Sequence, residues 1–185
     1  MKTCSLSQQL IRLGRDQRGV SAVEFAMLLP LMLTLYLGAV EVSQGVAIDR
    51  KVTLTARTVA DLASQVKQID TASDMQNILK ASAQVITPHD ATKVKVTVSE
   101  VKIDANSNAS IVWSCTLNGN KESGSVTFPA GAGALVVPNT WLIWSEVSYS
   151  YKPAIGYVVT GTLNLSDRIY MRPRLSADVK FDKTC

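Results

Sequence analysis

Residues 15–42 read "RDQRGVSAVEFAMLLPLMLTLYLGAVEV", and this stretch decides the fold. Within it, Val20–Val40 is a run of 21 residues with one charged member, Glu24. As a helix rising about 1.5 Å per residue, such a run covers the roughly 30 Å hydrocarbon core of a bilayer. A helix is expected because lipid offers no hydrogen-bond partners to an open backbone. We therefore predict a transmembrane helix over residues 20–42 that tolerates Pro30.

Most of the net positive charge of the chain lies N-terminal to this run. The formal net charge is +4, and residues 1–19 contribute +3 of it. Basic residues next to a span favour the cytoplasmic side, so we expect this leader in the cytoplasm and the body of the chain across the membrane. The body has no basic stripe with interleaved aromatic residues, so direct contact with nucleic acid is not expected.

Glu24 separates three interpretations of the run. A cleaved secretory signal is disfavoured, because the run is longer than a usual signal core and no A-x-A-like site follows it. A simple uncleaved anchor gives the carboxylate no role, since a charge costs roughly 3 kcal/mol at the centre of a span and less near its end. In that interpretation Glu24 merely lies at the headgroup level. The third interpretation starts from the basic leader, Gly19 before the run, and Glu24 as the fifth residue after that glycine, followed by Phe25. These features resemble the processing site of type IV prepilins.

The resemblance implies that prepilin peptidase cuts between Gly19 and Val20. The cut frees the α-amine of Val20, which lies one helical turn from Glu24. The two charges can neutralise each other, or the carboxylate can meet the amine of a neighbouring subunit, and either pairing lowers the cost of burying charge. Glu24 and Phe25 are therefore the residues expected to act in helix packing.

Residues 43–86 are predicted to be mainly helical. Apolar or small residues recur at helical spacing over residues 48–69, so the membrane helix is expected to continue as a long amphipathic helix. Gly45 is a candidate flex point in it. A second, short helix is expected at residues 73–83, with Ser73 as its N-cap.

The remaining residues, 87–185, alternate as strands do and predict an antiparallel sheet packed on the long helix, which makes an α+β fold. Two runs around "DANSNAS" predict a hairpin, and the change of apolar parity in the first run predicts a bulge near residues 99–100. "TWLIWSEVSYSY" predicts a third strand and "RIYMRPRL" a last one. Residues 117–140, rich in Gly, Asn, Ser and Pro, are expected to form a loop. The predicted apolar faces hold Val94, Val96 and Val98 in the first strand, Ile111, Trp113 and Cys115 in the second, and Trp141, Ile143, Val147, Tyr149 and Tyr151 in the third.

The stretches "VSAVEFAMLLPLMLTLYLGAVEVSQG" and "DRKVTLTARTVADLASQV", with the "VWSC" hairpin and the "MRPRL…C" ending, resemble the TadE/TadG-like family of the tight-adherence (Flp) pilus system. The resemblance implies a pilin-like fold and a minor pilin-like (pseudopilin) role in assembling a bacterial Flp pilus. Its implied partners are the membrane, other pilin or pseudopilin subunits, the Flp assembly machinery and prepilin peptidase. It implies a single-pass protein of the bacterial inner membrane, with its C-terminal domain in the periplasm or in the extracellular pilus, and a part in cell adhesion and biofilm growth.

No residue pattern predicts catalysis, a cofactor or a metal site. The single histidine, His89, lies in a turn-like "TPHD" stretch, where we expect an exposed loop residue, and the cysteines lack zinc-binding spacing. Cys115 and Cys185 are candidates for a disulfide if the body lies outside the cytoplasm.

The alternative class is an unprocessed, membrane-anchored periplasmic binding or scaffold module. It would use an aromatic face of the sheet to hold a ligand or an envelope component. Ordinary packing of a sheet explains the same aromatic spacing without a ligand. The residues in question are Trp113, Trp141, Trp144, Tyr149, Tyr151 and Tyr157.

Overall fold

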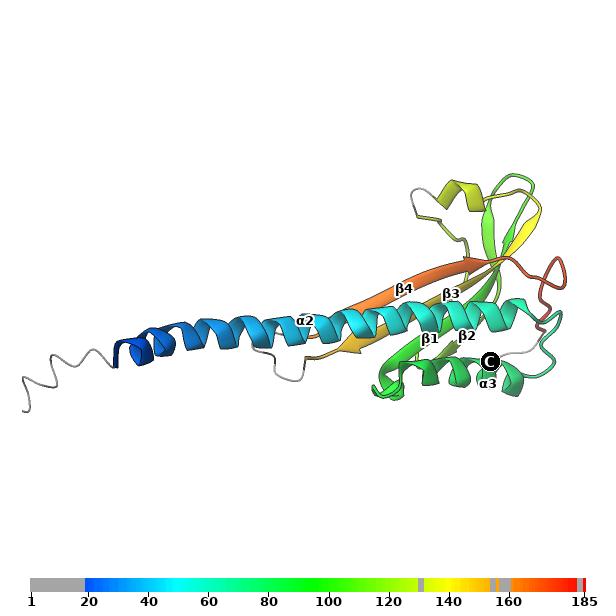
Figure 1. Cartoon of the computed structure of the whole chain (residues 1–185). Coiled ribbons are helices and arrows are strands. Elements are labelled where there is room, and N and C mark those ends of the chain that lie inside the picture. Colours follow the sequence, from blue (N-terminus) through cyan, green and yellow to red (C-terminus); the bar gives the residue numbers. More distant parts are fainter. Residues whose placement is uncertain (1–18, 130–131, 154–155, 157–160, 183–184) are drawn as a thin grey trace, which may run out of the picture.

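A computed structural model describes residues 19–129, 132–153, 156, 161–182 and 185 of the chain. The predicted α+β class is confirmed, because a long helix and a short helix accompany a four-stranded antiparallel sheet. Figure 1 shows the sheet lying beside the second half of the long helix, while the first half extends beyond the sheet. The elements are α2 (Val20–Ser64), α3 (Ala72–Ala83), β1 (Val94–Ile103), β2 (Ala109–Leu117), β3 (Thr140–Tyr151) and β4 (Leu163–Met171), with short 3-10 turns η2 (Gln84–Ile86), η3 (Ala91–Lys93) and η4 (Ala132–Leu135).

Helix α2 runs without interruption for 45 residues, through both Pro30 and Gly45. The helix has no break at Gly45, the expected flex point, and a Cβ atom at this position would lie 3.9 Å from the ring of Tyr151. The amphipathic stripe is confirmed, since the buried residues beyond the apolar run recur at helical spacing. They are Glu41, Ile48, Val52, Thr55, Ala56, Val59, Ala60, Ala63 and Ser64.

The N-cap of the short helix α3 lies two residues before the predicted one. Thr71, with extended backbone (φ −130°, ψ 154°), is the N-cap, and its hydroxyl accepts a hydrogen bond of 3.1 Å from the backbone N–H of Asp74. Ser73, predicted as the cap, lies inside the helix. Both positions carry residue types that cap helices well, and Ser73 also has Gln76 three residues later, so local sequence does not distinguish them.

The sheet has the order β2-β1-β3-β4, and the predicted hairpin is its β2-β1 pair. The register of that pair shifts between Glu100 and Val101, near the predicted bulge. The extra residue is Val112 in β2, whereas β1 keeps an unbroken register with β3. The shift puts Ile111 opposite Val101, on the face away from the helices, so the prediction that Ile111 shares a face with Trp113 is wrong.

In β1 the apolar residues change from even to odd positions because both faces of the sheet are buried, and not because the strand is kinked. Val94, Val96 and Val98 belong to the main core between the sheet and the helices, while Val101 and Ile103 belong to a second cluster on the opposite face. Part of the predicted loop covers this second cluster, through Val126, Phe128, Leu135 and Val136. The ring of Tyr170 in β4 contacts both the loop and the second cluster. Its centroid lies 5.3 Å from that of Phe128 in the loop and 6.1 Å from that of Trp144 in the cluster.

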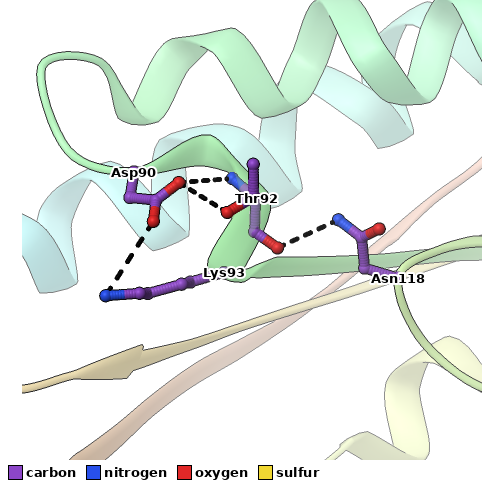
Figure 2. A network of polar contacts seen from close by, with 4 residues as sticks. All are labelled: Asp90, Thr92, Lys93 and Asn118. Carbon is purple, nitrogen blue, oxygen red and sulfur yellow. Dashed lines mark hydrogen bonds and ion pairs between the residues drawn. The ribbon is translucent and has the colours of Figure 1, made fainter.

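A small polar network ties the start of β1 to the end of β2 (Figure 2). The carboxylate of Asp90 accepts from the backbone N–H and the hydroxyl of Thr92, at 3.0 and 2.6 Å, and pairs with Lys93 at 3.9 Å. The side-chain amide of Asn118 donates to the carbonyl oxygens of Thr92 and Val94. His89 precedes this network, half-buried in the bend after η2, where its backbone N–H donates to the carbonyl of Ile86.

Candidate functional site

The most unusual surface of the described chain is the first half of α2. Its large apolar side chains project into solvent, with exposed fractions of 59% for Phe25, 77% for Met27 and 66% for Tyr36. By length and composition, α2 is a helix that could cross a membrane, and no other helix in the described residues passes that test. A soluble domain rarely leaves so large a contiguous apolar surface uncovered, so this half of the helix is built for a membrane or for other helices.

The four residues of the predicted processing and packing site lie at the outer tip of this helix. Gly19 is the N-cap, and no side chain there satisfies the free backbone N–H groups. Val20 opens the helix, and Glu24 follows one turn later, exposed like its neighbour Phe25. No residue in the described part of the chain forms an ion pair or a hydrogen bond with the side chain of Glu24. The residues of the leader, 1–18, lie outside the described part.

The opposite end of α2 is fixed to the sheet by polar contacts as well as by packing. The hydroxyl of Ser145 donates to the carbonyl of Ala56 at 2.6 Å, in a fully buried position between β3 and the helix. Arg174, after β4, pairs with Asp61 at 2.5 Å, and its backbone N–H donates to the carbonyl of Ser64. These contacts make the second half of α2 part of the domain and leave the first half free.

The C-terminal segment, residues 172–182 with Cys185, closes the same end of the domain. Lys180 pairs with the chain just after α2, where its N–H donates to Lys67 and its carbonyl accepts from Ile69. Cys185 and Cys115 form a disulfide with their Cα atoms 5.6 Å apart. The ring of Phe181 packs edge-on against Trp113, with centroids 5.6 Å apart.

Glu100 is a buried carboxylate beneath this segment. Its side chain is 2% exposed, and its Oε1 accepts a hydrogen bond of 2.6 Å from the backbone N–H of Val179. The indole N–H of Trp113 donates to the carbonyl of Val179, so this one residue is held from both sides. Burial raises the pKa of Glu100 to about 7, and the nearby Asp178 adds to the rise, while the hydrogen bond from Val179 opposes it.

Glu100 was not identified from the sequence as a functional candidate, although its position in the strand alternation indicated a buried acid. Glu100 continues the even-numbered series of Val94, Val96 and Val98, which face the main core. A charged residue at an inward position is rarely buried without a specific partner. The partner here is the backbone of Val179, 79 residues away, which alternation within one strand does not reveal.

We expect the stability of the domain to depend on pH through Glu100. An acid with a higher pKa in the folded state than in the unfolded state binds protons more tightly when folded. The stabilising contribution of Glu100 to the free energy of unfolding is therefore largest below pH 4.5 and is lost as the pH rises towards 7. The loss across that interval amounts to about 3 kcal/mol. Denaturant unfolding of the full chain in detergent, at a series of pH values, measures it.

The variant Glu100→Gln is the matched control for this slope. Glutamine retains an oxygen that can accept from Val179, but it does not titrate. The difference in unfolding free energy between the native chain and Glu100→Gln should change steadily between pH 4.5 and pH 7. Parallel profiles for the two proteins would show that Glu100 does not titrate in this interval.

The aromatic residues suggested for a ligand platform are mostly core residues. Trp113, Trp144, Tyr149 and Tyr151 are each at most 8% exposed. Trp141 is partly exposed, with Lys102 lying 5.1 Å from its ring, and Tyr157 lies outside the described residues. The described residues also contain no group of three or more His, Cys, Asp or Glu side chains placed to hold a metal ion.

Comparison with known proteins gives one finding. Residues 19–61 match a family model whose description is TadE-like protein, and this confirms the resemblance over that range. The match begins at Gly19 and ends within the part of α2 that packs on the sheet. No curated protein and no solved structure gives a significant match.

Proposed function

We propose that this chain, TadE-like over residues 19–61, is a minor pilin-like (pseudopilin) component of a bacterial Flp-type pilus. The TadE-like match supports association with the Tad pilus and with a membrane. The observation that carries the finer proposal is the exposed apolar half of α2, which bears a single carboxylate, Glu24, near its tip. A helix of this kind can anchor the chain in the inner membrane and then pack against other pilin helices.

The proposed maturation step is removal of the cytoplasmic leader, residues 1–19, by prepilin peptidase. The new α-amine of Val20 would then lie at the helix N-terminus, where the partial positive charge of the helix dipole disfavours a cation. Glu24 is placed at the i+4 position, on the same face of the helix, so its carboxylate can offset both charges. A neutral residue there would leave the amine without a partner in a low-dielectric setting.

The proposed topology places the sheet domain in the periplasm and, after assembly, on the outside of the pilus. The single-pass orientation follows from the basic leader. The Cys115–Cys185 disulfide supports it, because disulfides persist in oxidising compartments such as the bacterial periplasm. Within the bilayer, the exposed side chains of the apolar half would associate with partner helices through close packing, as membrane helices do.

The N-terminus of the mature chain tests the proposal. We expect the protein purified from cells that contain prepilin peptidase to begin at Val20, and the protein from cells without the enzyme to retain residues of the leader. Gly19→Leu should block the cut, because a large side chain replaces the residue before the scissile bond. Gly45→Ala, a glycine substitution elsewhere in the same helix, should be cut normally. A mature chain that keeps its leader in all cases would favour the unprocessed membrane-anchored module instead.

A further inference from the structure

We propose that the end of the sheet nearest the apolar half of α2 rests on the bilayer surface, where an open apolar groove contacts the lipid headgroup layer. The groove holds about 400 Å³ between the helix and the sheet. Its apolar lining comes from three segments, Val42 and Val46 of α2, Tyr151 and Pro153 at the end of β3, and Leu163 and Leu165 of β4. The inference rests on the proposed membrane anchoring of α2 and adds a second contact with the bilayer.

The length of the apolar run sets the height of the groove. If Val20–Val40 fills the hydrocarbon core of about 30 Å, the headgroup layer beyond it, about 6 Å thick, corresponds to about four helical residues. Those residues are 41–44, and the groove begins among them, with Val42. Val46 follows about 9 Å beyond Val40 along the axis, at the outer margin of this layer.

The sheet reaches the same level, so the groove has a second wall. Figure 1 shows the end of β3 and the start of β4 lying beside the middle of α2, where the helix leaves the domain. The hydroxyl of Tyr151 donates to the side-chain oxygen of Gln44 at 3.4 Å, which fixes the strand end to the helix at the headgroup level. A tyrosine with a buried ring and a polar tip is typical of a membrane interface.

The exposure and charge of the groove fit a lipid surface. Val42, Val46 and Leu163 are 55%, 47% and 39% exposed although they are apolar, and they continue the exposed apolar surface of the first half of α2. Lys152, exposed between Tyr151 and Pro153, places a cation where anionic headgroups would lie. Two acids also line the groove. Glu41 is buried, at 3% exposed, and Asp49, which is exposed, lies on the far side, about 13 Å beyond Val40.

Depth-dependent fluorescence quenching tests the contact. The full chain, with Cys4→Ser as background, is given one new cysteine, labelled with an environment-sensitive fluorophore, and placed singly in nanodiscs of phosphatidylcholine and phosphatidylglycerol. Val46→Cys and Leu163→Cys probe the two walls of the groove. We expect both labels to lose most of their emission when the lipids carry a quencher near the headgroup. Two walls on separate elements keep the test valid if one substitution disturbs folding.

Two further positions serve as matched controls. Leu175→Cys, an apolar residue 57% exposed beside the far end of α2, should not be quenched by any lipid. Met32→Cys, 59% exposed within the apolar run, should be quenched by mid-chain quenchers. If Met32 is quenched while Val46 and Leu163 behave like Leu175, the groove faces water or a neighbouring subunit, and this inference is overturned while the anchor stands. If Met32 is not quenched, both the anchor and the groove contact fail.

Discussion

Replacement of Glu24 by glutamine is expected to remove the chain from assembled pili. In the proposed mature protein the carboxylate offsets the amine of Val20, its own or that of a neighbouring subunit. Without it, a cation remains unpaired within the bundle at a cost of roughly 3 kcal/mol, which corresponds to roughly a hundredfold loss of incorporation. Immunodetection of the chain in sheared, purified pili, relative to the amount in the membrane fraction, measures this ratio.

The control for Glu24→Gln is Ser21→Ala, which alters an exposed residue of the same helical turn without a change of charge. Ser21→Ala should enter pili as the native chain does. Glu24→Asp keeps the charge on a shorter side chain and should lie between the two. Both glutamate variants should insert in the membrane at native levels, because the apolar run is unchanged. Native incorporation of Glu24→Gln would contradict the pairing of carboxylate and amine on which the proposed function is built.

Loss of the disulfide is expected to have a comparably large effect, on the stability of the domain. Cys115 and Cys185 are 70 residues apart in sequence, and a loop of that length is worth about 4 kcal/mol by its closure entropy. Cys185→Ala is the better test, since Cys115 is fully buried and its replacement would add a packing cost. Urea unfolding of the full chain in detergent, followed by tryptophan fluorescence, should give a lower midpoint for Cys185→Ala and a free energy of unfolding lower by that amount.

The same variant should also loosen the segment above Glu100. Val179 is held by Glu100 and Trp113, but the C-terminal residue that fixes the chain end to β2 is Cys185. We expect faster amide exchange at Val179 in Cys185→Ala, with little change at Val96 in the centre of the sheet. Cys4→Ser, a substitution in the leader sequence, should alter neither the midpoint nor the exchange. An unchanged midpoint in Cys185→Ala would show that packing alone holds the segment.

Much of the architecture was predictable because its signals are local. The apolar run specified the free half of α2, and the stripe from Ile48 onward specified the half that packs on the sheet. Alternation located the strands, and "DANSNAS" located the hairpin. Errors occurred where two local solutions were equally good, as with Thr71 and Ser73 as the cap of α3. They also occurred where a single residue, Val112, changed the register and moved Ile111 to the other face.

The functional residues also fall into a group that the sequence revealed and a group that it did not. Gly19, Val20, Glu24 and Phe25 were found from sequence because their spacing along one helix carries the proposed chemistry. The groove at Val46 and Leu163 was not, since its walls come from segments more than 100 residues apart. Glu100 was missed for the same reason, as its partner Val179 is 79 residues away in the sequence.

By itself, the sequence determined the long helix, its exposed apolar half and its lone carboxylate, because helical periodicity and residue polarity act over a few neighbouring residues. The tertiary structure alone decided the strand order β2-β1-β3-β4, the second apolar cluster behind the sheet, and the path of the C-terminal segment over Glu100. Those features depend on contacts between residues far apart in the chain. Their free energy comes from burial and hydrogen bonds that exist only once the whole domain has packed.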